Sequence, residues 1–176
     1  MVGAVELSVA FTNMVDLYLD SPNEDNICKL ALTRDKEGVL NGYAREALRL
    51  DPPFKGVYRT VLSNQTADGL AIQKDGQVFL DILAAGRNVV QPHYHTLLQY
   101  SYLYSQAQVF PEPETVNACR DQSGKKYIIS DGNISAFCLS SSFLINSRYC
   151  RCLGEDITVQ IMSQVLRGVF AIIRAQ

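Results

Sequence analysis

The chain has 176 residues, 47% of them hydrophobic, and a formal net charge of −2 at pH 7. That length suffices for one domain with a sizeable core. Lysines and arginines are scattered among acidic residues rather than gathered in a basic stripe, so no nucleic-acid partner is expected. No uncharged apolar run reaches the roughly 18 residues of a membrane-spanning helix, so no transmembrane segment is predicted.

The N-terminus and the cysteines indicate in which cellular compartment the protein is expected. Residues 1–6 lack a basic region and end in an acid, unlike a secretion signal. Five cysteines are an odd number at no disulfide-framework spacing, which fits reduced thiols. A cytoplasmic location is therefore expected. The chain opens within a helical pattern that has no obvious cap, so we also expect further sequence upstream.

Apolar residues at helical spacing predict three of the helices. The first covers 3–19, and the second follows a turn at 21–25 and runs through Cys28 to Leu32. The last covers 154–174, with its apolar residues at spacings of three and four: Ile157, Ile161, Val165, Val169 and Ile172.

A further helix ends at a double proline. It carries Glu46 and Arg49, which share one face because they lie three residues apart and can therefore pair. Its apolar side would hold that pair against a core; it comprises Tyr43, Ala47 and Leu50. Pro52 and Pro53 stop the helix.

A small β-sheet is predicted after the prolines. Residues 56–62 are rich in β-branched and aromatic side chains, and 70–80 carry Asp75-Gly76 between two short apolar runs, which indicates a hairpin. These strands are too few for a sandwich. The expected fold class is therefore mainly α with a small β-sheet.

Two segments have neither helical nor alternating periodicity. Residues 88–106 hold both histidines and four of the nine tyrosines, and residues 133–148 are rich in serine. We interpret the chain, 1–176, as a single partial domain with insertions at these two places. His93, His95, Cys150 and Cys152 do not have the spacing of a zinc finger, knuckle or ribbon, so no zinc site is predicted.

Several motifs follow one another in a fixed order: Glu46-x-x-Arg49, Pro53, Arg59, Phe110-Pro-Glu-Pro113, Arg120 and Cys152-Leu-Gly154. In this order they resemble the C-terminal part of a cytochrome P-450, a haem-thiolate domain. Residues 11–19 are similar to the distal helix of fungal psi-factor-producing oxygenases and linoleate diol synthases. Those proteins are fusions of a fatty-acid dioxygenase with a P-450-like domain, so the resemblance implies an upstream dioxygenase domain.

The resemblance implies haem b (iron protoporphyrin) as cofactor and assigns residues to it. Cys152, followed by Gly154, stands at the position of the axial iron ligand. Cys150 is the rival but lacks a glycine two positions on, and a buried free thiol is the alternative for either. Arg59 stands at the place of an arginine that binds a haem propionate; the alternative is a solvated arginine on a strand.

Other residues resemble the family's structural ion-pair residues and its residues on the distal side of the haem. Glu46, Arg49 and Arg120 resemble its structural ion-pair triad. Glu6, in the motif at residues 3–8, resembles the distal acid that relays protons, although Leu7 stands where the hydroxyl would be. The diol synthases place a carboxamide at this site, and a solvated acid is the alternative.

The cysteine loop departs from the family pattern. Ile145 and Arg148 stand where the family has phenylalanine and glycine. Deleting 133–148 would restore the glycine spacing, and removing most of 88–106 would bring residues 84–87 next to residues 109–113. Our hypothesis is that both segments are translated introns or recent insertions. A mature transcript that retains both would contradict the intron hypothesis.

The implied activity is that of an oxidoreductase in oxylipin biosynthesis. It would act on an unsaturated fatty acid or its hydroperoxide, either as a hydroperoxide isomerase, which needs no external electrons, or as a monooxygenase, which needs them. The alternative is a non-catalytic fragment that binds no haem and at most associates with another protein through exposed apolar helix faces.

Overall fold

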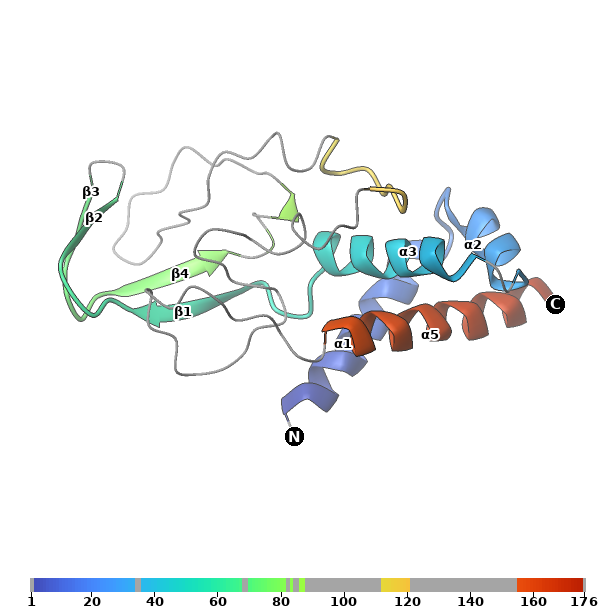
Figure 1. Ribbon diagram of the computed structural model, residues 1–176, viewed down its shortest axis with the longest axis horizontal. Coiled ribbons are helices and arrows are strands. Elements are labelled where there is room, and N and C mark those ends of the chain that lie inside the picture. Colours follow the sequence, from blue (N-terminus) through green and yellow to red (C-terminus); the bar gives the residue numbers. More distant parts are fainter. Residues whose placement is uncertain are drawn as a thin grey trace.

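The structure is a computed structural model and describes residues 2–33, 36–67, 70–81, 83, 86–87, 112–120 and 155–175. Within these residues, four helices pack together at one end of the molecule and a narrow β ribbon projects from the other end (Figure 1). The predicted fold class, mainly α with a small β part, is confirmed. The predicted insertions at 88–106 and 133–148 lie outside the described residues.

The helices begin and end close to their predicted bounds: α1 covers Val2–Tyr18, α2 Glu24–Ala31, α3 Glu37–Leu50 and α5 Glu155–Ala175. Helix α3 ends two residues before Pro52, because a proline has no amide proton to donate and disfavours helical geometry in the residue before it. Pro52 itself is fully buried.

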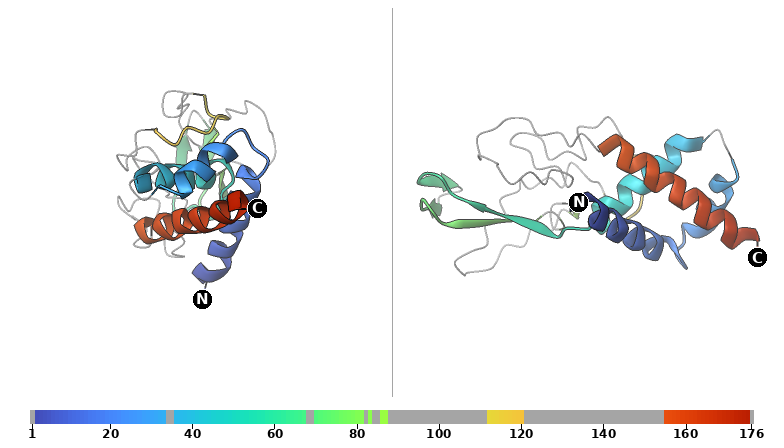
Figure 2. Two further views of the ribbon diagram at one scale, coloured as in Figure 1. Left: turned by 90° about the vertical axis from the view of Figure 1, so that its right-hand side faces the viewer. Right: turned by 90° about the horizontal axis from the view of Figure 1, so that it is seen from below.

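Helix α5 runs antiparallel to α3 and also packs on α2, while α1 crosses below α3 (Figures 1 and 2). Side-chain contacts fix this direction. Asp156 at the start of α5 lies 3.7 Å from Arg45, and Gln164 donates a hydrogen bond of 3.1 Å to Glu37 at the start of α3. Further along α5, Arg167 donates to the carbonyl oxygen of Ala31 at the end of α2.

The hydrophobic core lies where these helices meet. Its largest members are fully buried: Met14, Tyr18, Ile27, Leu40, Met162, Leu166 and Phe170. The Tyr18 hydroxyl donates a 2.7 Å hydrogen bond to the carbonyl oxygen of Tyr43, and the two rings pack edge to face at 5.4 Å. This pair joins α1 to α3 and satisfies the one polar atom that Tyr18 takes into the core.

The side of α5 that faces the core differs from the stripe picked out in the sequence. Ile157, Ile161 and Ile172 are 61%, 41% and 64% exposed, whereas the buried stripe is Val159, Met162, Leu166 and Phe170. The helix is apolar on two sides. Periodicity identifies the helix but does not tell which of the two sides packs inward.

Among the described residues, α5 alone has the length and apolar composition of a membrane-crossing helix, with a mean hydropathy of 1.3 over Asp156–Ala175. Core helices pass the same test, and Leu166 and Phe170 lie in the core. The helix also carries Arg167, whose guanidinium donates a hydrogen bond to the carbonyl oxygen of Ala31 at the end of α2. This one helix is weak evidence for a membrane span.

The β ribbon is built from two nested antiparallel pairs. Strand β1 (Gly56–Thr60) pairs with β4 (Gln77–Asp81), and β2 (Gln65–Ala67) pairs with β3 (Leu70–Ile72) at the tip (Figure 1). Between the two pairs, Val61 donates to the carbonyl oxygen of Gly76, which continues the ribbon.

The predicted hairpin over 70–80 is wrong, because β3 and β4 flank Asp75-Gly76 but do not pair with each other. Asp75 adopts a φ of 65° and its amide donates to the carbonyl oxygen of Val61. The turn is therefore formed, but each flanking strand pairs with a strand before it in the chain. The residues between β2 and β3 are also Asp-Gly, Asp68 and Gly69, and lie outside the described residues.

Candidate functional site

The candidate site is built around a buried ion pair on α3. Arg49 donates from Nε to Glu46 Oε1 at 3.0 Å and from Nη2 to Glu46 Oε2 at 2.9 Å. Both side chains are almost completely buried. The spacing of three residues on one helix face allows this two-pronged geometry, in which the planar guanidinium matches the carboxylate.

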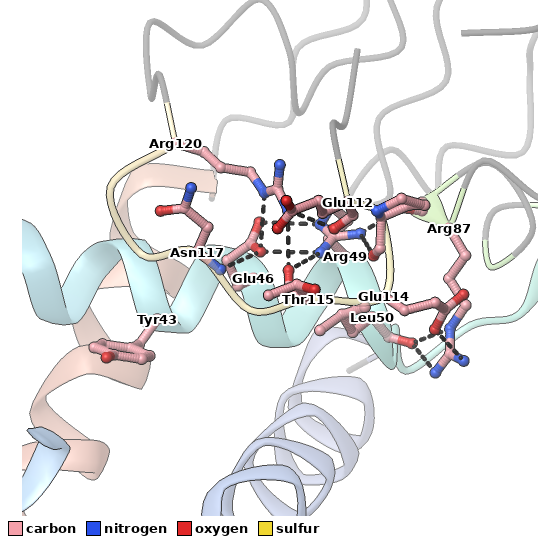
Figure 3. A network of polar contacts seen from close by, with 12 residues as sticks. Tyr43, Glu46, Arg49, Leu50, Arg87, Glu112, Glu114, Thr115, Asn117 and Arg120 are labelled. Atoms are coloured by element: carbon pink, nitrogen blue, oxygen red, sulfur yellow. Dashed lines mark hydrogen bonds and ion pairs between the residues drawn. The ribbon is translucent and has the colours of Figure 1, made fainter. Parts of the chain in front are cut away.

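The segment 112–120 wraps over this pair and is held by it (Figure 3). Arg49 Nη1 donates to the carbonyl oxygen of Pro113 at 2.6 Å, and Nη2 donates to that of Thr115 at 3.3 Å. In return, the amide of Asn117 donates to Glu46 Oε2 at 2.9 Å. The ion pair of α3 therefore provides both donors and acceptors for a segment that lies outside any helix or strand.

Arg120 adds a second guanidinium to the same carboxylate. Its Nε donates to Glu46 Oε2 at 3.2 Å, and its Nη2 donates to the carbonyl oxygens of Glu112 and Thr115, both at 2.9 Å. Glu112 has a φ of 52°, which turns the chain at the start of the segment. The structure thus brings together Glu46, Arg49 and Arg120, the three residues that the resemblance places in one triad.

The charges of this cluster are unequal, because one carboxylate faces two guanidinium groups. Among the described residues, backbone carbonyl oxygens accept further hydrogen bonds from Arg49 and Arg120, so peptide dipoles help to solvate the second positive charge. Such a cluster adds little net stability. Removing only one of its charged side chains is costly, because the buried charge that remains would lose its partner.

Two further residues complete the cluster, and from the sequence alone they are named only as part of residues 84–87, without a role of their own. Arg49 Nη1 also donates to the carbonyl oxygen of Gly86 at 2.6 Å. A Cβ at Gly86 would lie 2.3 Å from the carbonyl oxygen of Arg49, so only glycine fits there without a backbone shift. Arg87 donates twice to the carbonyl oxygen of Leu50 at the end of α3 and once to Glu114.

Glu6, the predicted distal acid, lies on α1 and is partly buried. Its Oε2 is shielded from solvent and has no hydrogen-bond partner among the residues that the structure describes. A carboxylate oxygen that is shielded without a donor is unusual, and a donor from a bound molecule would satisfy it.

The predicted haem contacts fall largely outside the described part of the chain. Cys152, Gly154 and the rival Cys150 are not among the described residues, and neither are His93 and His95. Arg59 lies in β1 opposite Val78, but its side chain is outside the described set. Their roles stay predictions.

Two cysteines lie in the described residues. Cys28 is buried in α2, whereas Cys119 is exposed beside Arg120. Burial raises the pKa of the Cys28 thiol, and the nearby Glu24 carboxylate raises it further. The buried Cys28 thiol therefore stays protonated at neutral pH. The described residues contain no group of three or more His, Cys, Asp or Glu that could hold a metal ion.

No protein-family model matches the sequence, and no curated protein matches it. Among solved structures, the fold is similar to the crystal structure of CalO2, with a TM-score of 0.59 and 17% identity. The match covers 94% of this chain and 32% of CalO2, so this chain spans about a third of that protein's length. At this identity the likeness concerns the fold alone.

Proposed function

We propose that this chain is the C-terminal part of a haem-thiolate domain of the cytochrome P-450 type, similar to that of psi-factor-producing fatty-acid oxygenases. The observation that carries the proposal is the buried cluster of Glu46, Arg49 and Arg120. Glu46 and Arg120 are 74 positions apart in the chain, yet they form an ion pair, which supports the triad that the resemblance implies. A surface helix with a chance Glu-x-x-Arg pair would have no reason to bind a second, distant arginine.

Two features of the chain fit a haem, one at the start of α5 and one on α1. Helix α5 begins at Glu155, three residues after Cys152, and the amides at a helix start favour an anionic sulfur. On α1, Glu6 Oε2 is shielded from solvent and has no hydrogen-bond partner among the described residues, which is compatible with the distal-acid role that we propose for it. Cys152 would hold the iron and Arg59 a propionate.

A thiolate-ligated haem, when bound, supplies oxygen–oxygen bond cleavage. The residues of this chain would then act by positioning the segment before the cysteine and the carboxyl group of Glu6. The cluster on α3 fixes residues 112–120, which precede the cysteine in the sequence, and Glu6 would hold or release a proton at Oε2. The substrate class that we propose is an unsaturated fatty acid or its hydroperoxide, converted in the cytoplasm.

Haem binding is the first test. The purified chain is titrated with haem, and the carbon-monoxide difference spectrum of the reduced sample is recorded for the wild type, Cys152→Ser and Cys150→Ser. We expect a thiolate-type band for the wild type and for Cys150→Ser, and its loss in Cys152→Ser. A wild-type chain without such a band would favour the non-catalytic fragment, which the departures at Ile145 and Arg148 support.

Product analysis then separates the two chemistries. Conversion of a fatty-acid hydroperoxide to a diol without an electron donor would identify an isomerase, because the hydroperoxide itself supplies the oxygen and the oxidising equivalents. Hydroxylation of the fatty acid only with an electron donor would identify a monooxygenase. Glu6→Gln should slow either reaction at unchanged haem content if its carboxyl handles a proton.

A further inference from the structure

Asn13 links α1 to the end of α3 through a side chain that has no role in the function proposed above. Its Nδ2 donates a partly buried hydrogen bond of 3.1 Å to the carbonyl oxygen of Asp51, the C-cap residue of α3. Carbonyl oxygens at a helix end have no amide of the same helix to accept from, and the two prolines that follow α3 have no amide proton to offer. The carboxamide of Asn13 therefore satisfies this acceptor from another element.

A second polar contact joins the same two helices at a different point. The Tyr18 hydroxyl donates to the carbonyl oxygen of Tyr43 at 2.7 Å, in the middle of α3, whereas Asn13 contacts the end of α3. Met14, which lies between Asn13 and Tyr18 in the sequence, is fully buried in the core. Two polar contacts at separate points of both helices resist rotation of α1 about its own axis as well as sliding of α1 along α3.

Glu6 lies on the same side of α1 as Asn13. The two residues are seven positions apart, which on a helix is two turns less about 20°. Ala10, between them on the adjoining side of the helix, is buried. The rotation of α1 that the Asn13 hydrogen bond fixes is therefore also the rotation that decides where the carboxyl group of Glu6 points.

We propose that Asn13 is a positioning residue for Glu6, because it anchors α1 to the end of α3 and so holds the Glu6 carboxyl group in its shielded place. The proposal rests on the function proposed above, in which Glu6 handles a proton. The end of α3 then fixes two parts of the chain. The carbonyl oxygen of Leu50 accepts from Arg87, and the next one, of Asp51, accepts from Asn13.

Carboxyl labelling of the purified full chain tests the position of Glu6 without haem. A carbodiimide and glycine ethyl ester convert accessible carboxyl groups to amides, and peptide mass spectrometry gives the rate at each residue. Asp16, an exposed acid on the same helix, is the internal reference. Asn13→Leu removes the donor at similar side-chain size. We expect it to raise the labelling rate of Glu6 relative to Asp16 about three- to tenfold, the ratio to which one lost hydrogen bond corresponds.

Thr12→Val is the matched control. The Thr12 hydroxyl donates to the carbonyl oxygen of Ser8 within α1 at 3.1 Å, so this change also removes one side-chain hydrogen bond but no contact with α3. We expect Thr12→Val to leave the labelling of Glu6 unchanged. Asn13→Gln, which keeps a donor, should restore part of the protection. Circular dichroism checks that each variant stays folded.

Turnover of the haem-loaded chain shows whether Asn13 acts through Glu6. Asn13→Leu should slow conversion of a fatty-acid hydroperoxide by a similar factor at unchanged haem content, and Thr12→Val should not. In a chain that already carries Glu6→Gln, adding Asn13→Leu should have no further effect, because the carboxyl group that Asn13 positions is gone. A merely structural role would slow both chains equally.

Equal labelling of Glu6 in the wild type and in Asn13→Leu would overturn the proposal. So would an equal rise in Thr12→Val, or a further loss of turnover when Asn13→Leu is added to Glu6→Gln. A wild-type chain without a thiolate-type haem band would instead contradict the function proposed above, and the labelling rates would still decide whether Asn13 fixes Glu6.

Discussion

Glu46 is the residue on which the polar cluster depends. Its two carboxylate oxygens accept from both guanidinium groups and from the amide of Asn117, with no solvent exposure. The side chain thus links one turn of α3 to a segment about seventy residues later in the chain. Arg49 is buried as well and the Arg120 side chain is only 8% exposed, so little water can replace the carboxylate if it is removed.

We therefore predict that Glu46→Ala lowers the free energy of unfolding by about 3–5 kcal/mol, because Arg49 and Arg120 would remain buried without their anion. Urea denaturation followed by circular dichroism measures this. The control is Lys55→Ala, which removes the exposed ion pair with Asp51. Exposed pairs contribute about 0–1 kcal/mol, so losses of equal size in the two variants would contradict the buried-cluster account.

The sequence predicts part of this cluster and omits the rest for a physical reason. A spacing of three on a helix places Glu46 beside Arg49 whatever else happens. The carbonyl oxygens of Gly86, Pro113 and Thr115 are acceptors that every residue carries, so no letter in the sequence marks them. Arg87 looks like any surface arginine until the end of α3 is known to lie beside it.

At the scale of single elements, α5 is the helix that the others share. It packs against α1, α2 and α3, and its inner stripe supplies a large part of the core. The guanidinium of Arg167 also reaches the carbonyl oxygens of Ala31 and Thr33 at the end of α2, where unpaired acceptors need donors. Loss of the α5 contacts would affect all three neighbours at once.

We predict that Leu166→Ala, on the inner face of α5, lowers the free energy of unfolding by about 2–5 kcal/mol by leaving a cavity. The matched control is Leu32→Ala, the same change at an exposed position beside α2, which should stay within about 0.5 kcal/mol of the wild type. Thermal and urea denaturation provide the comparison. Similar losses at both positions would mean that the core lies elsewhere.

The elements also show where sequence patterns are ambiguous. Periodicity and the prolines are local signals, and they predict that α1, α2, α3 and α5 exist and where they begin and end. The inner face of α5 does not follow, because Ile161 and Leu166 are equally apolar. The partner of β4 does not follow either, because the Asp75-Gly76 turn sets a local bend while pairing with β1 depends on residues some twenty positions earlier.

At the scale of the whole molecule, the helices and the ribbon differ in how they are stabilised. The helices share one core, whereas on the ribbon the described side chains that are buried are few, chiefly Val61 and Val78. The tip, formed by β2 and β3, projects well beyond the helices (Figure 2). An antiparallel ribbon of two strands is marginally stable by itself.

We predict that backbone amides of β2 and β3 exchange with deuterium much faster than those of α3 and α5. The ribbon tip can open without disturbing the core, while the helices open only when the core does. Hydrogen exchange followed by mass spectrometry resolves these segments. Comparable protection of the ribbon tip and of α5 would show that the tip is covered by another part of the molecule.

The position of α5 in the chain has a consequence for synthesis. The apolar sides of α2 and α3 are covered by α5, which is translated more than a hundred residues after α3 ends, so α5 cannot cover them during that interval. At about 5–20 residues per second, that interval lasts several seconds or longer. The nascent chain is therefore expected to depend on chaperones that shield apolar helices until α5 leaves the ribosome.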